Sequence, residues 1–146
     1  MPNKMPLLNY RYRVEISGIV VAGFSEVSGL NQEIEVEEFQ EGGVDFVHHL
    51  PKGIKHSNLI LKRGLSTSDE LRKWYHEVIK AIHYRKAIPK SSDIYISIIG
   101  TTGEDEVRLH IKSAYPIKWS GPQLNAKGSD VALETLELVH EGLVIV

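Results

Sequence analysis

Three histidines, His48, His49 and His56, gather in one short stretch and are the first candidates for chemistry. Imidazole is a common metal ligand, but a zinc site needs three or four ligands held in a fixed geometry. Neighbouring side chains on a strand or an extended loop point apart, so His48 and His49 cannot readily share one metal ion. The stretch therefore favours polar loop residues over a metal site.

The remaining polar groups also favour structural roles. His140-Glu141 begins like the zinc-protease pattern H-E-x-x-H, but Val144 stands at the fifth position and the segment is strand-like. The turn from Arg63 to Thr67 precedes a predicted helix, where an anion can bind, yet it lacks the G-x-x-x-x-G-K spacing of a phosphate-binding loop. A turn with a helix cap is the favoured interpretation.

A run of glutamates offers paired carboxylates for acid–base chemistry. Glutamates that alternate along a strand more often form a solvated face or meet charged neighbours. The run consists of Glu33, Glu35, Glu37, Glu38 and Glu41. No serine lies in a G-x-S-x-G elbow. We therefore predict no catalytic residue, no metal site and no cofactor, and a protein that is not an enzyme.

Length and composition set the class of protein. The chain has 146 residues, 42% of them hydrophobic, which fits a single domain with a proper core. Its 17 basic and 19 acidic residues give a net charge of −2, so no strong field favours nucleic acid or an anionic membrane. It has no cysteine, no signal-peptide-like apolar segment at the N-terminus and no apolar run long enough to span a membrane.

The stretch Arg11–Gly43 organises the expected fold. Tyr12, Val14 and Ile16 alternate with polar residues, as in a half-buried strand, and alternation resumes at Glu33. We expect a long, bent antiparallel ribbon that ends in a flexible Gly42-Gly43 tip. Further strands are predicted over 59–63, 93–99, 106–113 and 131–140, the last with a bulge where its apolar phase slips between Leu133 and Leu136. Pro116 is expected to break the chain.

One helix is predicted over about 67–86. Thr67 and Glu70 have the spacing of a capping box, and Pro89 ends the helix near 85–87. Its apolar residues form one stripe, in which Leu71, Trp74, Val78 and Ile82 are expected to pack on the barrel; Tyr75 and Ile79 lie in the same stripe.

The residues from 40 to 58 are the least regular part of the chain and are expected to form a loop. A long loop with apolar side chains in a compact domain is usually functional or docked on a partner. The candidate inter-subunit residues are Gly42, Gly43, Val44, Phe46, Val47, Leu50 and Ile54.

These elements predict a mainly β fold with one α-helix. We expect an antiparallel barrel or sandwich of six to seven strands, flanked by the single helix. Residues 1–9 are expected to form an N-terminal arm, and residues 10–146 a single domain.

The order of several segments resembles a known family. They are RYRVEISGI, AGFSEVSGL, EVEEFQEGG, LPKGIKHSNLILKRGLSTSDELRKW and YPIKWSGPQLNAKGSDVALETLELVHEGL, from about Tyr10 to Leu143. Together they resemble the tail-tube proteins of contractile phage tails and phage-tail-like injection particles, the T4-like tube proteins, whose fold is shared with type VI secretion needle proteins.

The resemblance implies a structural protomer of the inner tube. It implies stacked hexameric rings around a lumen, with sheath protein, baseplate or hub proteins and lumenal cargo as partners. Assembly is expected in the bacterial cytoplasm, in a phage tail or a released tail-like particle. In such tubes the loop after EGG reaches a neighbouring subunit, which makes residues 40–56 the candidate interface. The alternatives are a tube initiator or baseplate adaptor of the same family and, from another class, a small-ligand-binding β barrel or a small hydrolase, which would need a convergent polar pocket.

Overall fold

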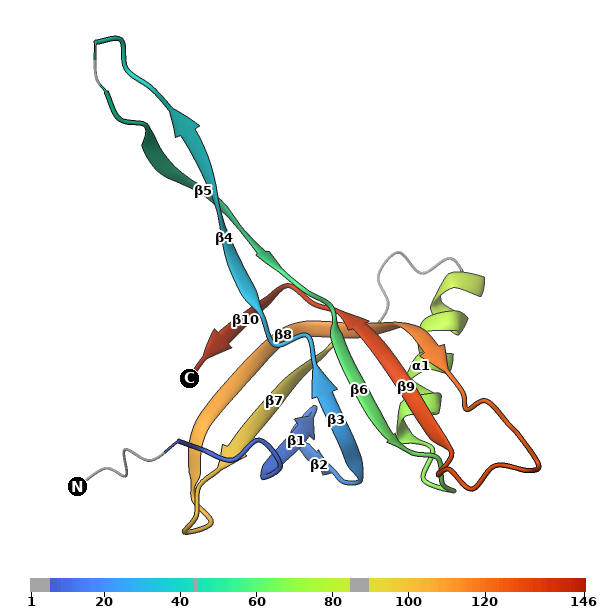
Figure 1. Cartoon of the computed structure of the whole chain (residues 1–146). Coiled ribbons are helices and arrows are strands. Elements are labelled where there is room, and N and C mark those ends of the chain that lie inside the picture. Colours follow the sequence, from blue (N-terminus) through green and yellow to red (C-terminus); the bar gives the residue numbers. More distant parts are fainter. Residues whose placement is uncertain (1–5, 44, 85–89) are drawn as a thin grey trace.

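The computed structural model describes residues 6–43, 45–84 and 90–146, and within them the chain forms ten strands and one helix (Figure 1). The strands are β1 (Tyr12–Ile16), β2 (Ile19–Val21), β3 (Phe24–Ser28), β4 (Gln32–Phe39), β5 (His48–His56), β6 (Leu59–Gly64), β7 (Ser92–Ile99), β8 (Asp105–Ser120), β9 (Leu133–Val139) and β10 (Gly142–Ile145); the helix is α1 (Glu70–His83). The mainly β, antiparallel fold with a single helix is confirmed, although it has more strands than the six or seven expected.

Eight strands form one curved sheet that wraps into a barrel. Their order is β2-β1-β7-β8-β9-β6-β3, with β10 paired to β8. The long strand β8 joins the two halves, because its first part pairs with β10 and its last part with β9. The sheet path ends at β2 and β3, and the Tyr12 hydroxyl crosses between β1 and β3 by donating to the Phe24 carbonyl oxygen at 3.0 Å.

The core is formed by every second residue of the strands. Val14 of β1, Leu59 and Leu61 of β6, and Leu136 and Leu138 of β9 are buried, while the residues between them are more exposed or polar. Leu61 lies opposite Leu136 in the β6–β9 register, so these strands present one apolar face inward. The strand-like alternation predicted for Tyr12, Val14 and Ile16 is confirmed, since all three lie in or against this core.

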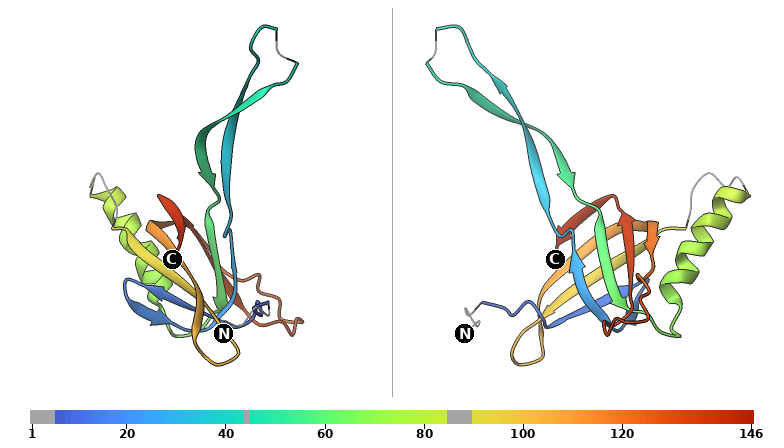
Figure 2. Two further views of the ribbon diagram at one scale, coloured as in Figure 1. Left: turned by 90° about the vertical axis from the view of Figure 1, so that its left-hand side faces the viewer. Right: turned by 45° about the vertical axis from the view of Figure 1, so that its right-hand side comes forward.

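The helix packs along the outside of the barrel (Figure 2). Leu71 and Val78 are buried and Trp74 packs against the core, as the apolar stripe predicts. Ile82 was wrongly assigned to that face, because its side chain is 71% exposed. The N-cap is Asp69 and makes no side-chain capping bond, so the predicted Thr67–Glu70 capping box does not form. The predicted end near 85–87 lies outside the described residues.

Two other predictions about strands were wrong. Pro116 does not break the chain but lies inside β8, at a register shift between Pro116 and Lys118 where the strand is bulged. β9 carries no bulge against β6, since its pairing runs without a shift from Leu133 to Leu138. Its apparent phase slip has another cause: Glu134 occupies an inward position of the strand.

Polar contacts fix the neighbouring strands β7 and β8. The backbone N–H of Ser113 donates to Asp93 Oδ1 at 2.9 Å, at a residue whose φ is 49°. This hydrogen bond, helped by His110 at 3.3 Å, holds the pKa of Asp93 below its usual value.

Candidate assembly surface

The hairpin formed by β4 and β5 stands outside the barrel. The two strands pair only with each other, as a separate two-stranded sheet, and project from one end of the barrel (Figures 1 and 2). Residues 48–56 are therefore a strand and not part of an irregular loop as expected. Sequence reasoning missed this strand because neither of its faces is buried, so it lacks the alternation that a core imposes.

One face of the hairpin is apolar. Ile34 lies directly opposite Ile54, and Val36 opposite Pro51, so the four side chains share a face. Ile34, Val36 and Ile54 are all exposed, with Ile54 at 63%. The opposite face carries Glu33, Glu35 and Glu37, of which Glu35 pairs with Lys55 at 3.2 Å, whereas Glu38 lies on the same face as Val36, opposite His49. This fits the solvated, charge-paired face predicted for the glutamate run.

The tip of the hairpin carries a cluster of three aromatic rings. His48 stacks on Phe39 with ring centroids 5.0 Å apart, and Phe46 meets the His48 ring edge-on at 4.9 Å. Phe46 is 60% exposed, and Phe39 is exposed as well. We call Phe39, Phe46 and His48 the aromatic knob.

The structure places the candidate inter-subunit residues along this hairpin. Gly42 and Gly43 form the turn at the tip. Gly43 has a φ of 85°, a conformation that glycine adopts without strain. Val47 lies in the connecting segment and Leu50 on β5, both exposed, while Val44 lies outside the described residues. Ile34, Val36 and Phe39 of β4 were missed as members of this surface; for Ile34 and Val36, the alternation with glutamates was the available signal.

The base of the hairpin is tightly built. Gly29, with φ of 87°, lies so close to the Asn58 carbonyl that a Cβ would collide with its oxygen. His56 stacks on His140 with centroids 4.2 Å apart, and His140 Nε2 lies 2.9 Å from the Ser57 carbonyl oxygen. These contacts join the base to His140, between β9 and β10, so the barrel sets the direction of the hairpin.

The polar residues first considered for chemistry have structural surroundings. His48 belongs to the aromatic knob, His49 lies 4.0 Å from Glu38, and His56 stacks on His140. Within the ranges that the structure describes, no group of three or more His, Cys, Asp or Glu side chains is placed to hold a metal ion. In the same ranges, no helix is long and apolar enough to cross a membrane.

A buried ionic cluster, which sequence reasoning missed, ties the helix to the barrel. Glu134 of β9 is fully buried and accepts hydrogen bonds from Arg63 Nε at 2.7 Å, Arg72 Nη1 at 2.8 Å and Trp119 Nε1 at 3.3 Å. Arg63 also donates to Glu70 at 2.9 Å. The turn after Arg63 therefore does not leave this guanidinium free to bind an anion.

Two residues of the cluster, Arg63 and Glu70, have shifted pKa values. Burial alone would lower the pKa of Arg63, but its hydrogen bonds to Glu134 and Glu70 raise it above the ordinary value. The pKa of Glu70 is lowered, first by its own backbone N–H and then by Arg63. Arg63 is thus held as a cation between β6, β9 and the start of α1.

The chain thus forms an antiparallel barrel with one flanking helix and a free-standing hairpin. The family model described as T4-like virus tail tube protein gp19 matches residues 8–144. The chain therefore belongs to this tail tube family and is a structural tube protomer. No curated protein sequence matches it significantly.

Solved structures share the fold. A chain of the PVC sheath–tube complex, an extracellular contractile injection system in the extended state, is similar with a TM-score of 0.84 at 22% identity, over 97% of this chain and 92% of that one. A chain of the anti-feeding prophage tube-terminating cap gives 0.85 at 22% identity, over 99% and 93%. Hcp1 from Flavobacterium johnsoniae gives 0.56 at 12% identity, over 93% and 94%.

Proposed function

We propose that copies of this chain close into hexameric rings and that these rings stack into the hollow inner tube of a phage tail or contractile injection particle. The observation that carries this proposal is the hairpin, which exposes apolar side chains on an element that the barrel does not use for its own core. They are Ile34, Val36, Phe39, Phe46, Val47, Leu50 and Ile54. Surfaces of this kind mark sites of protein association.

The energy of such a contact fits repeated assembly. Fully burying one Val, Leu, Ile or Phe side chain contributes about 1.5–3 kcal/mol, so a few side chains give several kcal/mol before ordering entropy is subtracted. An isolated two-stranded hairpin is only marginally stable in water. We therefore infer that the hairpin is mobile in the free protomer and is ordered by a neighbouring subunit. Since the contact is apolar, it weakens little in salt, unlike contacts made by the β4 glutamates.

The partners of the relatives extend the proposal. A sheath–tube complex and an anti-feeding prophage baseplate both contain chains with this fold, the latter with a TM-score of 0.78. We propose a sheath outside the tube, baseplate or hub proteins at its end and cargo in its lumen. Its role is assembly without catalysis, through residues 10–146 as one domain, with residues 1–9 as an arm.

The similarity to chains in a baseplate and in a tube-terminating cap also favours a second candidate, a tube initiator or baseplate adaptor. The two roles differ in self-assembly. A tube protomer stacks on itself, whereas an adaptor stops after one ring unless a tube protein is added. Negative-stain microscopy of the purified chain distinguishes long tubes from single rings.

The test of the interface is the double variant Phe46→Ser with Leu50→Ser. Both side chains are exposed in the protomer, at 60% and 48%, so the monomer melting temperature should stay unchanged while tubes become short or absent. Ile82→Ser, on an apolar residue of the helix that is 71% exposed, is the control and should leave tube length intact. If the double variant unfolds the monomer, or if it forms tubes of normal length, the hairpin is not the interface.

A further inference from the structure

One histidine lies inside the aromatic knob at the tip of the hairpin. His48 stacks on Phe39 with ring centroids 5.0 Å apart, and Phe46 meets its ring edge-on at 4.9 Å. His48 is half-buried beside these two rings, which are themselves exposed. Histidine is the side chain that ordinarily gains or loses its charge between pH 5 and pH 8. A surface offered for association therefore contains a group whose charge changes in that range.

The charged side chains around His48 are acidic. Two belong to β4 and two to the segment that connects β4 with β5: Glu37, Glu38, Glu41 and Asp45. Residues 37–50 contain no lysine or arginine. The adjacent His49 belongs to the other face of the hairpin, where it lies 4.0 Å from Glu38. In the free protomer a positive charge on the His48 ring is therefore compatible with its surroundings, because the ring reaches water and lies among carboxylates.

Association changes the surroundings of this ring. In the proposed tube a neighbouring copy covers the aromatic knob, which removes water from Phe39, Phe46 and the His48 imidazole. Burial penalises a charged group far more than a neutral one. The covered knob therefore holds the imidazole neutral, whereas the free knob takes up a proton in acid. Because the free chain then binds more protons than the assembled chain, acid favours the free chain.

We propose that His48 makes the assembly of this chain pH-dependent, and that acidification weakens the contact made by the aromatic knob. This inference rests on the proposed tube function and adds the regulation of its contact. The contact has its full strength at neutral pH and loses it as pH falls below about 6.5, where histidine ordinarily titrates. If each contact excludes one proton, its association constant falls up to about tenfold for each further pH unit. A hexameric ring repeats the contact, so a modest change per copy is multiplied.

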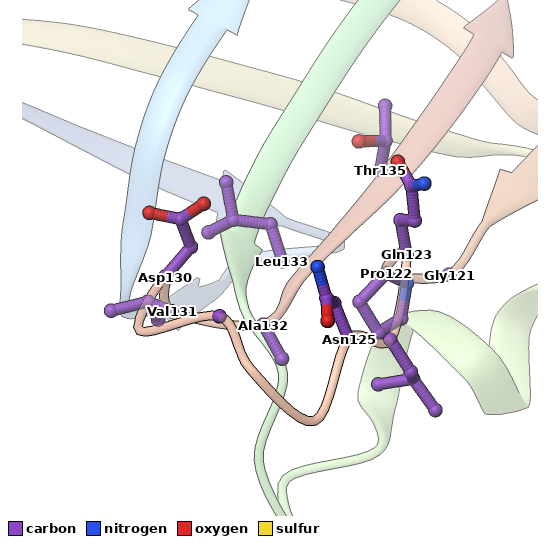
Figure 3. Close-up of a pocket in the computed structure, with 11 residues that line it drawn as sticks. Gly121, Pro122, Gln123, Asn125, Asp130, Val131, Ala132, Leu133 and Thr135 are labelled. Atoms are coloured by element: carbon purple, nitrogen blue, oxygen red, sulfur yellow. The ribbon is translucent and has the colours of Figure 1, made fainter.

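The other histidines of the chain lie away from the knob. They are His56 and His140 at the base of the hairpin, His110 on β8, and His76 and His83 on α1. The hollow of about 760 Å³ bordered by the segment 121–132 is lined by no histidine, and Asp130 is the ionisable residue of its lining (Figure 3). Carboxyl groups ordinarily titrate near pH 4. A response between pH 5.5 and 7.5 that depends on the residue at position 48 therefore identifies this imidazole.

Sedimentation of assembled tubes tests the proposal. Tubes of the unmodified chain are brought to pH 7.5 or to pH 5.5, and the protein concentration left in the supernatant is measured after centrifugation. This concentration should be at least about tenfold higher at pH 5.5. His48→Phe keeps an aromatic ring against Phe39 and cannot take up a proton, so its supernatant concentration should be the same at both pH values. His48→Gln should also show no response, which separates the loss of titration from a gain of apolar surface.

The matched control is His49→Gln, which removes the adjacent histidine from the other face of the hairpin and should keep the response of the unmodified chain. The monomeric variant Phe46→Ser with Leu50→Ser should give the same circular dichroism spectrum at both pH values. A monomer that unfolds at pH 5.5 assigns the response to folding and overturns the inference.

The remaining outcomes separate this inference from the proposed function. Equal supernatant concentrations at the two pH values, tighter assembly at pH 5.5, or a His48→Phe variant that keeps the response each overturn the role of His48. All three leave the tube proposal standing, because tubes are present. Absence of rings and tubes at both pH values, even with baseplate partners present, overturns the tube proposal and this inference together.

Discussion

Replacing the buried carboxylate Glu134 by its amide should strongly destabilise the protomer. In Glu134→Gln one oxygen becomes an NH₂ group, so an N–H donor faces the donors of Arg63 or those of Arg72 and Trp119. Arg63 is almost fully buried and loses one of its two carboxylate partners, keeping only Glu70 at 2.9 Å. Removing one partner of a buried ion pair typically costs about 3–5 kcal/mol. For a domain of this size that corresponds to a fall in melting temperature of about 10–20 °C.

The assay is thermal unfolding of the monomer, followed by circular dichroism. All variants are made in the Phe46→Ser, Leu50→Ser background, because assembly would raise the apparent stability by mass action. The control is Glu26→Gln. Glu26 pairs with Lys62 at 3.2 Å, but both side chains reach solvent, so its loss should cost about 0–1 kcal/mol.

A second variant separates the charge pair from simple disruption of the fold. In Arg63→Leu with Glu134→Leu, neither buried charge remains, and apolar replacement of a buried pair is often neutral. Arg72 is partly exposed and can turn to water. The double variant should therefore melt above Glu134→Gln. The contrary result is that Glu134→Gln lowers the free energy of unfolding by no more than about 1 kcal/mol, the loss expected for the Glu26 control. In that case the buried pair does not hold the helix to the barrel, and the reasoning is refuted.

Two further predictions follow from the backbone and from the carboxyl groups. Gly29→Ala should cost at least about 2 kcal/mol of folding stability, because the new Cβ meets the Asn58 carbonyl and the residue has a positive φ. Gly18 also has a positive φ but faces open space, so Gly18→Ala should cost about 1–2 kcal/mol. Equal melting temperatures for the two variants would contradict this. Because the folded protein lowers the pKa of Glu70 and Asp93, their stabilisation is complete above their unfolded pKa values of about 4 and is lost as pH falls through the folded values. The melting temperature should therefore drop below about pH 4.5, and a flat profile down to pH 3 would exclude this contribution.

Elements that bury one face against the core could be predicted from the sequence. Each such element has one side facing the core and the other facing solvent. This produces the alternation in β1 and β6 and the apolar stripe with a period of 3.6 residues in α1. The stripe failed only at Ile82, at the end of the helix that rises beyond the barrel. Periodicity records which residues share a face but not how far the neighbouring surface extends.

The features that could not be predicted are those where no core imposes a pattern. β5 contains Pro51 and Gly53, two residues typical of loops, yet it pairs along its length with β4. The two strands are joined by backbone hydrogen bonds, and because β5 buries neither of its faces, its sequence carries no apolar alternation that would reveal it. At Glu134 the opposite problem arises. The strand is regular, but a charged residue occupies a core position, so the pattern of apolar residues falsely indicates a bulge. Its two arginine partners come from β6 and α1, which only the tertiary structure brings together.

The protomer inverts the usual distribution of side chains at two places, and both suit a tube subunit. Charges that globular proteins leave outside are paired inside, where Glu134 joins strand and helix into one body. Apolar side chains that are usually buried stand outside on the hairpin. Because the hairpin is a separate sheet, its contacts contribute little to the folding of the barrel, and the ionic cluster contributes nothing direct to the hairpin surface. Folding and assembly should therefore respond to different substitutions: Glu134 variants should lower the melting temperature, and Phe46 or Leu50 variants should shorten tubes.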